Sequence, residues 1–165
     1  MKIQILDRTK KKKFVDGLNE FGITKISEML VRSGEERIRA FSGDLDREQI
    51  MDLWKLLPIE GVGLYVGKDM VNRSGVREVR LSLDGMHVWK EQLEGRVLVL
   101  TEAQEAEWFL GRDIELEEKQ KMDEGFVCVK SFDGKDFVGI GKVGADGMKL
   151  FGFLPKERRR KERMS

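Results

Sequence analysis

The feature that most constrains the fold is a run of β-prone segments, separated by Asp-Gly pairs, in the last third of the chain. The first segment starts at Phe126, the second spans residues 137–143 and the third spans residues 148–154. Asp133-Gly134 and Asp146-Gly147 separate them. A tight hairpin turn needs a positive φ, which glycine adopts at the least cost, so Asp-Gly between such segments predicts β-hairpins.

A cluster of basic residues follows these hairpins. Pro155 has no amide hydrogen to donate to a sheet, so the last strand is predicted to end there. Six of the eight residues from Lys156 to Arg163 are basic, whereas residues 96–155 hold twelve acidic and eight basic residues. The net charge of the whole chain is only +1. Charge of this kind, gathered in one place, predicts a local phosphate-binding surface, with RNA as the partner.

The preceding part of the chain mixes helix and strand patterns. Val79, Leu81 and Leu83 alternate with polar residues, which is typical of a strand with one buried face. Asp84-Gly85 is expected to interrupt that strand, and Gly95 is the predicted domain boundary. The expected elements are a strand at 3–6, a helix at 10–21, a hairpin over 26–41, a helix from Asp44 or Asp46 to Pro58, strands at 61–66 and 76–83, and a helical turn over 86–93.

We therefore predict the α+β class, with an α+β module over residues 1–94 and a smaller β-rich module over residues 95–165. The second module opens with a predicted buried strand at residues 96–100. Thr101 is a good helix N-cap, and Gln104 completes a capping box with it. The helix is expected to stop at Gly111 and lead into another strand over residues 112–116.

This layout resembles the PUA domain, the RNA-binding module of pseudouridine synthases and archaeosine transglycosylases. The resemblance covers residues 95–160, and its most specific elements are FLGRD at 109–113, VGIGKV at 138–143 and LPKERR at 154–159. The last pattern looks most like the PUA domains associated with Nop/Sun-type RNA cytosine-5 methyltransferases. GVGLYVGK at 61–68, followed by VRLSLDG at 79–85, resembles the pre-PUA half of Nip-type ribosome-biogenesis proteins and their archaeal relatives.

The resemblance implies a small β pseudobarrel that binds RNA between the glycine loop after its first helix and its last strand. Glycine in that loop lets backbone amides approach a phosphate, and arginine supplies a planar, always-charged donor. Glu115, Glu117 and Glu118 depart from this chemistry, because they repel RNA unless they face away. The implied RNA-binding residues are Leu110, Gly111, Arg112, Asp113, Gly141, Lys142, Leu154, Lys156, Arg158, Arg159 and Arg160.

No catalytic, cofactor or metal site is predicted. Residues 139–144 match the dinucleotide motif G-x-G-x-x-G, but that motif needs a following helix, and here strand-like segments flank it. These glycines are better explained by strand bending or close packing. Cys128 lies in the middle of a strand, where a buried thiol is unreactive. His87 has no metal-ligating neighbours, and no pair of carboxylates forms an acid–base set.

The expected function is non-catalytic binding of structured RNA, either rRNA or tRNA, in support of RNA modification or ribosome biogenesis. One alternative is an RNA-targeting subunit of a separate RNA cytosine-5 methyltransferase, and another is a protein-binding scaffold in a pre-ribosomal particle. The basic tail could also be a solubilising end. A single cysteine, the lack of a signal-peptide pattern and the lack of apolar runs of about 18–20 residues predict a cytoplasmic protein outside the membrane.

Overall fold

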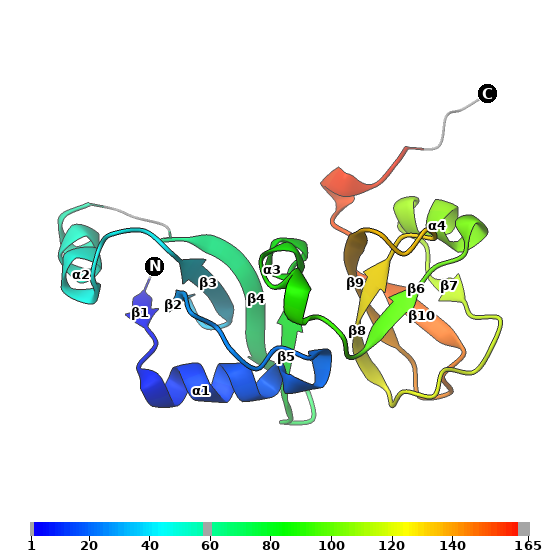
Figure 1. Ribbon diagram of the computed structural model, residues 1–165, viewed down its shortest axis with the longest axis horizontal. Helices are drawn as coiled ribbons and strands as arrows, with labels where there is room; N and C mark the ends of the chain where they lie inside the picture. The colour runs from blue at the N-terminus through cyan, green and yellow to red at the C-terminus, as the bar shows by residue number, and fades with distance from the viewer. Residues whose placement is uncertain (1, 58–60, 162–165) are drawn as a thin grey trace. The chain divides into compact units, whose positions relative to one another are not determined.

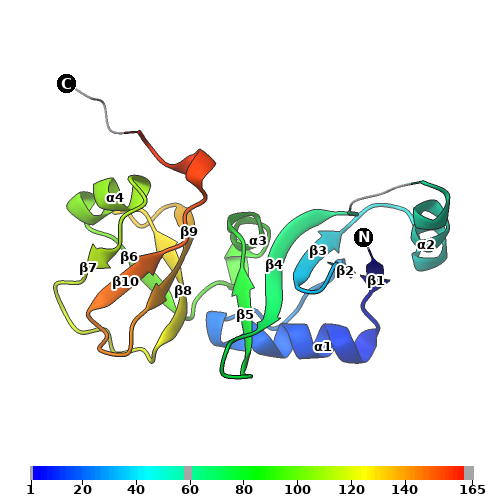
Figure 2. The same cartoon turned by 180° about the vertical axis from the view of Figure 1, so that it is seen from behind.

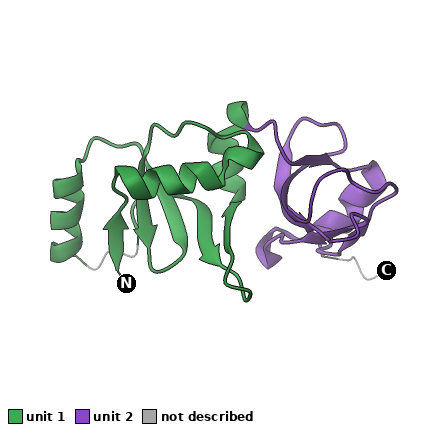
Figure 3. Ribbon diagram, turned by 90° about the horizontal axis from the view of Figure 1, so that it is seen from below, with its two compact units in different colours: residues 1–92 green, residues 93–165 purple. Residues whose placement is uncertain are grey.

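Two five-stranded sheets organise the chain in the computed structural model, which describes residues 2–57 and 61–161. Each sheet belongs to its own compact unit, one formed by residues 1–92 and the other by residues 93–165 (Figure 3). Gly95, the predicted domain boundary, lies near the start of unit 2. Both units combine helices with sheet, so the predicted α+β class is confirmed.

Unit 1 is an antiparallel meander in which neighbouring strands in the sequence are neighbours in the sheet, in the order β1-β2-β3-β4-β5 (Figures 1 and 2). The strand predicted at 3–6 and the hairpin predicted over 26–41 are confirmed, and the strand lies at the edge of the sheet. The elements are β1 (Ile3–Ile5), α1 (Arg8–Gly17), β2 (Met29–Ser33), β3 (Arg37–Phe41), α2 (Arg47–Leu56), β4 (Leu64–Val71), β5 (Arg77–Leu81) and α3 (Leu83–Val88), with 3-10 helices at Asn19–Phe21 and Lys90–Gln92.

The two longer helices of unit 1 cover opposite faces of its sheet. On one face α1 lies against β5, where Gly17 leaves room for the side chain of Val79. On the other face Ile50 of α2 packs on apolar side chains of β1 and β2. A capping box between Asp46 and Gln49 starts α2. Pro58, the predicted end of that helix, lies outside the described residues.

The prediction for residues 83–85 is wrong. The strand β5 ends at Leu81, and Leu83 and the Asp84-Gly85 pair belong to α3. The side chain of Ser82 accepts a hydrogen bond of 3.0 Å from the amide of Gly85, which caps the helix start. Glycine is needed at 85 for packing, because a Cβ there would lie 2.1 Å from the carbonyl oxygen of Val66.

Unit 2 is a curled, mixed sheet in the order β6-β8-β9-β10-β7 (Figure 1). Both predicted hairpin turns are confirmed, with Gly134 and Gly147 at φ of 70° and 69°. The strand β6 pairs in parallel with β8 at the sheet edge. Leu98 and Leu100 are buried but Val99 is 51% exposed, so the predicted buried strand is buried on one side only. The elements are β6 (Val97–Val99), α4 (Glu102–Phe109), β7 (Ile114–Glu115), β8 (Gly125–Lys130), β9 (Phe137–Val143), β10 (Lys149–Gly152) and a 3-10 turn (Lys156–Arg158).

The core of unit 2 is centred on Trp108, whose side chain is only 1% exposed. Its indole nitrogen donates a hydrogen bond of 3.2 Å to the carbonyl of Val138. A Cβ on Gly139 would lie 2.9 Å from the indole ring, and one on Gly152 would lie 3.4 Å away. The glycines of the two strands therefore provide the space into which the tryptophan packs.

This packing predicts different costs for two glycine substitutions. Gly139→Ala should destabilise unit 2 by about 1–3 kcal/mol beyond its backbone strain, because the new methyl group meets the Trp108 ring. Gly134→Ala is the control, since Gly134 also has a positive φ but no atom lies within 4 Å of its added Cβ. Denaturant unfolding of the two variants would measure the difference, and equal losses of stability would contradict the packing argument.

In unit 1 the carboxylate of Asp69 holds two arginines on the α1 side of the sheet. Arg77 donates from Nε and Nη2 over 2.7 and 3.0 Å, and Arg32 donates from Nη2 over 2.8 Å. Burial of the Asp69 carboxyl raises its pKa, but hydrogen bonds from Arg77 and Arg32 outweigh this and hold the pKa below its ordinary value. The side chain is 10% exposed, so solvent screens these ion pairs only weakly.

Asp69→Asn should destabilise unit 1 by about 1–3 kcal/mol at neutral pH and flatten its acid dependence. A depressed pKa means that the unfolded chain takes up the proton first as pH falls. The stabilisation is therefore present at neutral pH and is lost below the ordinary aspartate pKa of about 4. Denaturant titrations over a pH series would test this. The control is Asp16→Asn, whose side chain is half exposed, and an Asp16 effect as large as that of Asp69 would contradict the prediction.

Candidate nucleic-acid interface

The candidate interface lies where α4 ends and the chain leaves the sheet. Thr101 and Gln104 form the predicted capping box, with bonds of 2.9 and 3.2 Å, so the start of the helix is set. At the other end Gly111 has φ of 78°, and its amide donates to the carbonyl of Trp108 over 2.9 Å. We call residues 109–113 the α4 corner. Its position follows from the burial of Trp108 one residue earlier.

The tail, residues 156–161, returns to the α4 corner. The amide of Arg160 donates to the carbonyl of Phe109 over 2.6 Å, and the Arg160 guanidinium lies 4.8 Å above the centre of the Phe109 ring. Arg159 donates from Nε to the carbonyl of Leu154 over 2.9 Å. Leu154 is itself buried in the core. Two of the three consecutive arginines are therefore held against the end of α4.

Gly111 plays a different role from the one predicted. Its amide, like that of Arg112, already donates to a carbonyl of α4, so neither is open to a phosphate. A Cβ on Gly111 would lie 2.5 Å from both Cδ and Nε of Arg159. The glycine thus lets the Arg159 side chain lie across the loop. The expectation of exposed backbone amides is wrong because the helix end uses them as its own cap.

The other corner residues are also engaged with the protein. Arg112 lies 3.1 Å from the Glu107 carboxylate, and both side chains are about half exposed. Asp113 accepts a long hydrogen bond of 3.4 Å from the amide of Gly152, which ties the corner to β10. Leu110 is half-buried beside them. These contacts orient the corner, while the exposed cations come from the tail.

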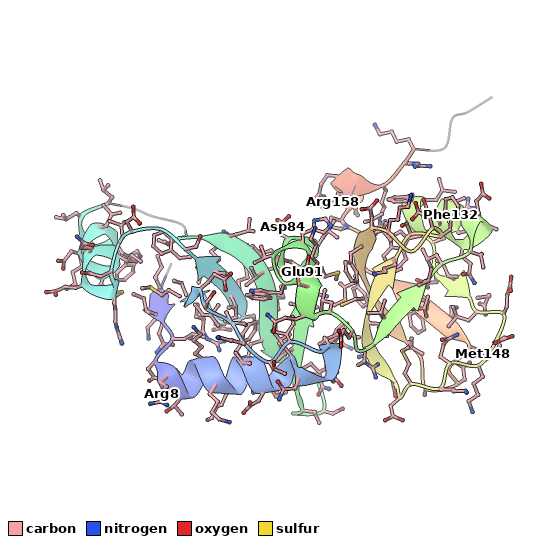
Figure 4. The ribbon with its side chains drawn as sticks, in the orientation of Figure 1. Arg8, Asp84, Glu91, Phe132, Met148 and Arg158 are labelled. Atoms are coloured by element: carbon pink, nitrogen blue, oxygen red, sulfur yellow. The ribbon has the colours of Figure 1, made fainter. Side chains whose placement is uncertain are left out.

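Lys156 and Arg158 lie on the exposed 3-10 turn that starts the tail, where Figure 4 labels Arg158. Pro155 precedes the turn, and β10 ends at Gly152, three residues before the proline. Arg163, the last residue of the basic cluster noted in the sequence, belongs to residues 162–165, which lie outside the described residues. The described tail carries a single acidic residue, Glu157, among five basic ones.

The structure does not bring Gly141 and Lys142 to the α4 corner. Gly141 is buried between Val127 and Gly152 in the middle of the sheet. Lys142 follows it on the opposite face from the core, where its ammonium lies 5.2 Å from the centre of the Phe126 ring. Gly141 has a packing role instead, since a Cβ there would lie 2.6 Å from the Leu150 side chain.

Cys128 and His87 lie in different units and in different environments. The Cys128 side chain is fully buried, and burial raises the pKa of its thiol to about 12, against the weaker opposing effect of Arg96. His87 is exposed on α3. Within residues 2–57 and 61–161, no group of three or more His, Cys, Asp or Glu side chains could hold a metal ion.

One contact of the interface was not predicted, the stacking of Arg160 on Phe109. The adjacent aromatic residues at 108 and 109 were the available signal, because neighbours on a helix cannot both face the core. Trp108 takes the buried position, and Phe109 is left at the rim, where a cation covers its ring. Arg160, which supplies the cation, is more than fifty positions away from Phe109 in the sequence. The contact between the two residues could therefore not be predicted from a local pattern.

Comparison with protein-family models and with curated proteins gives no match for this chain. Among the helices that the structure describes, none is both long and apolar enough to cross a membrane.

The contact between Gly111 and Arg159 can be tested by a double-mutant cycle. Gly111→Ala should displace the Arg159 side chain and break its bond to Leu154, in addition to straining the backbone. In an Arg159→Ala background only the strain remains, so the cost of Gly111→Ala should be about 0.5–1.5 kcal/mol smaller there. Denaturant unfolding of the four proteins measures this coupling, and additive costs would show that the side chain does not lie over the glycine.

Proposed function

We propose that this chain binds structured RNA, either rRNA or tRNA, through the α4 corner and the tail, and that it catalyses no reaction itself. The observation that supports the proposal is that two arginines are held at the end of α4. Arg159 donates a hydrogen bond to the carbonyl of Leu154, and Arg160 contacts the carbonyl and the ring of Phe109. On this view, unit 2 is a PUA-like pseudobarrel. Its role would be to support RNA modification or ribosome biogenesis in the cytoplasm.

Arginine side chains that the protein holds in place suit a polyanionic ligand better than the arginines of a free tail would. The hydrogen bond from Arg159 goes to a backbone carbonyl, which satisfies one donor without neutralising the positive charge. The remaining guanidinium donors can bind a phosphate bidentately. Because the carbonyl bond and the contact with Gly111 already restrict this side chain, less conformational entropy is lost when RNA binds.

The position of the arginines also fits the electrostatics of the helix. The carboxyl end of α4 carries partial negative charge, which favours a cation such as the Arg160 guanidinium beside Phe109. The exposed cations Lys156 and Arg158 extend the positive surface along the tail. RNA phosphates would thus meet up to four basic side chains within five residues of sequence, and affinity would come mainly from phosphate contacts.

A second candidate function is supported by exposed leucines on unit 1. Leu56 and Leu57, at the end of α2, are 79% and 55% exposed, and Leu53 on the same helix is 36% exposed. Apolar side chains grouped in this way are typical of a protein contact. They favour the alternatives in which the chain is a targeting subunit of an RNA methyltransferase or a scaffold in a pre-ribosomal particle.

The proposal predicts that Arg158, Arg159 and Arg160 set the salt dependence of RNA binding. Replacing all three by alanine should weaken binding and lower the slope of log affinity against log salt by roughly three counterions. Filter binding with an unmodified tRNA transcript over a salt series measures both quantities. The matched control is the triple Arg→Lys variant, which keeps the charge and should keep most of the slope. An unchanged slope in the alanine variant would refute the role of the tail.

A further inference from the structure

A group of basic side chains in unit 1 has no part in the site described above. It lies on the α2 side of the sheet, over β3, β4 and β5, which are adjacent in the sheet order (Figures 1 and 2). The side chain of α2 that is buried, Ile50, packs on Ile3, Ile5 and Val31 of β1 and β2. We call the group of side chains formed by Arg37, Arg39, Tyr65 and Lys68 on β3 and β4 the β3–β4 face.

Strand register shows that these four side chains share one side of the sheet. Arg39 is paired with Tyr65, and Arg37 with Lys68, and directly paired residues in antiparallel strands point to the same side. Tyr65 and Lys68 are three residues apart and would normally face opposite sides. The register shifts between Ile38 and Arg39, so that Val66 has no paired residue on β3, and this bulge brings Tyr65 and Lys68 onto the same side.

The charges converge on the tyrosine ring. The guanidinium of Arg37 lies 6.0 Å from the centre of the Tyr65 ring. Burial raises the pKa of the Tyr65 hydroxyl, while Arg80, Arg37 and Arg39 act in the opposite direction because they stand close to it. Three arginines therefore surround one half-buried tyrosine. Arg37 and Arg39 lie close enough to repel each other, and an anion bound between them would offset that repulsion.

The described part of the protein provides little neutralisation at Arg37 and Arg39. Arg39 donates from Nη1 to the carbonyl of Gly63 over 3.0 Å, and its Nε is buried without a hydrogen-bond partner among the described residues. Within that same part of the chain, no carboxylate forms an ion pair with Arg37 or Arg39. Glu36 lies 3.5 Å from Lys68 and offsets part of the charge at one end. Glu78 stands on the same side and accepts from Asn72.

We propose that the β3–β4 face is a second contact surface for the phosphate backbone of the same RNA. This inference rests on the proposed function and deepens it, because it assigns unit 1 a direct share in RNA binding. Charge complementarity selects the partner: Arg37 and Arg39 supply unneutralised guanidinium donors for phosphates, and Tyr65 supplies a ring beside them on which an unpaired base can stack. One chain then contacts RNA with both units.

The test compares four proteins by filter binding with an unmodified tRNA transcript over a salt series. They are the wild-type chain, the Arg37→Gln/Arg39→Gln variant, the tail variant with alanine at 158–160, and the control Arg8→Ala/Lys12→Ala. The control removes two exposed charges from α1, which covers the other side of the sheet. The β3–β4 variant should lower the salt slope by roughly two counterions, and the control should lower it less. Circular dichroism confirms that each variant is folded.

Cross-linking gives a second readout that does not depend on a substitution. Ultraviolet irradiation of the wild-type complex, followed by mass spectrometry of the peptides, should place RNA adducts on the peptide that contains Tyr65. Adducts confined to unit 2, with a β3–β4 variant that binds like the control, would overturn this inference and leave the proposed function intact. If only the β3–β4 variant loses affinity, the tail site is overturned, and so is the claim that both units contact the RNA. A wild-type chain that does not bind RNA would overturn both.

Discussion

The burial of Trp108 between the glycines of β9 and β10 is the contact on which the candidate interface depends. The indole fills the interior of the curled sheet because Gly139 and Gly152 carry no side chain there. It thereby sets the position of α4, and with it the end of the helix at Gly111. Leu154, packed in the same core, sets where the chain leaves the sheet. The tail arginines reach the end of α4 because both ends of that path are anchored in one core.

Four arginines of this protein form two groups that differ in whether a carboxylate accepts their hydrogen bonds. Arg32 and Arg77 donate to the Asp69 carboxylate, which neutralises them and makes them part of the structure of unit 1. Arg159 and Arg39 donate instead to backbone carbonyls, which orient the guanidinium and leave its charge in place. An arginine bound to carbonyls alone is a pre-positioned cation, and each proposed contact surface for RNA contains one such residue. Charge count alone does not separate the two groups.

Local signals in the sequence predicted local features well. The Asp-Gly pairs at 133–134 and 146–147 form the expected turns, and the Thr101–Gln104 capping box starts α4 as expected. The same kind of signal failed at residues 83–85, where Ser82 caps a helix and the alternating pattern of β5 stops earlier. It also failed for Gly111, whose amide is used by the helix end and whose surface is covered by Arg159. In both cases a contact between distant segments, or a cap, decided between two conformations that the pattern allowed.

The sequence by itself determined the α+β class, the hairpins of unit 2, the helix caps and the concentration of basic residues after Pro155. These follow from φ preferences, side-chain periodicity and local capping, which act over a few residues. Only the tertiary structure decided that Arg160 stacks on Phe109, that Gly141 is buried, and that a bulge places Tyr65 and Lys68 on one side of a sheet. Those outcomes depend on strand register and on packing between segments far apart in the chain, and no short stretch of sequence carries that information.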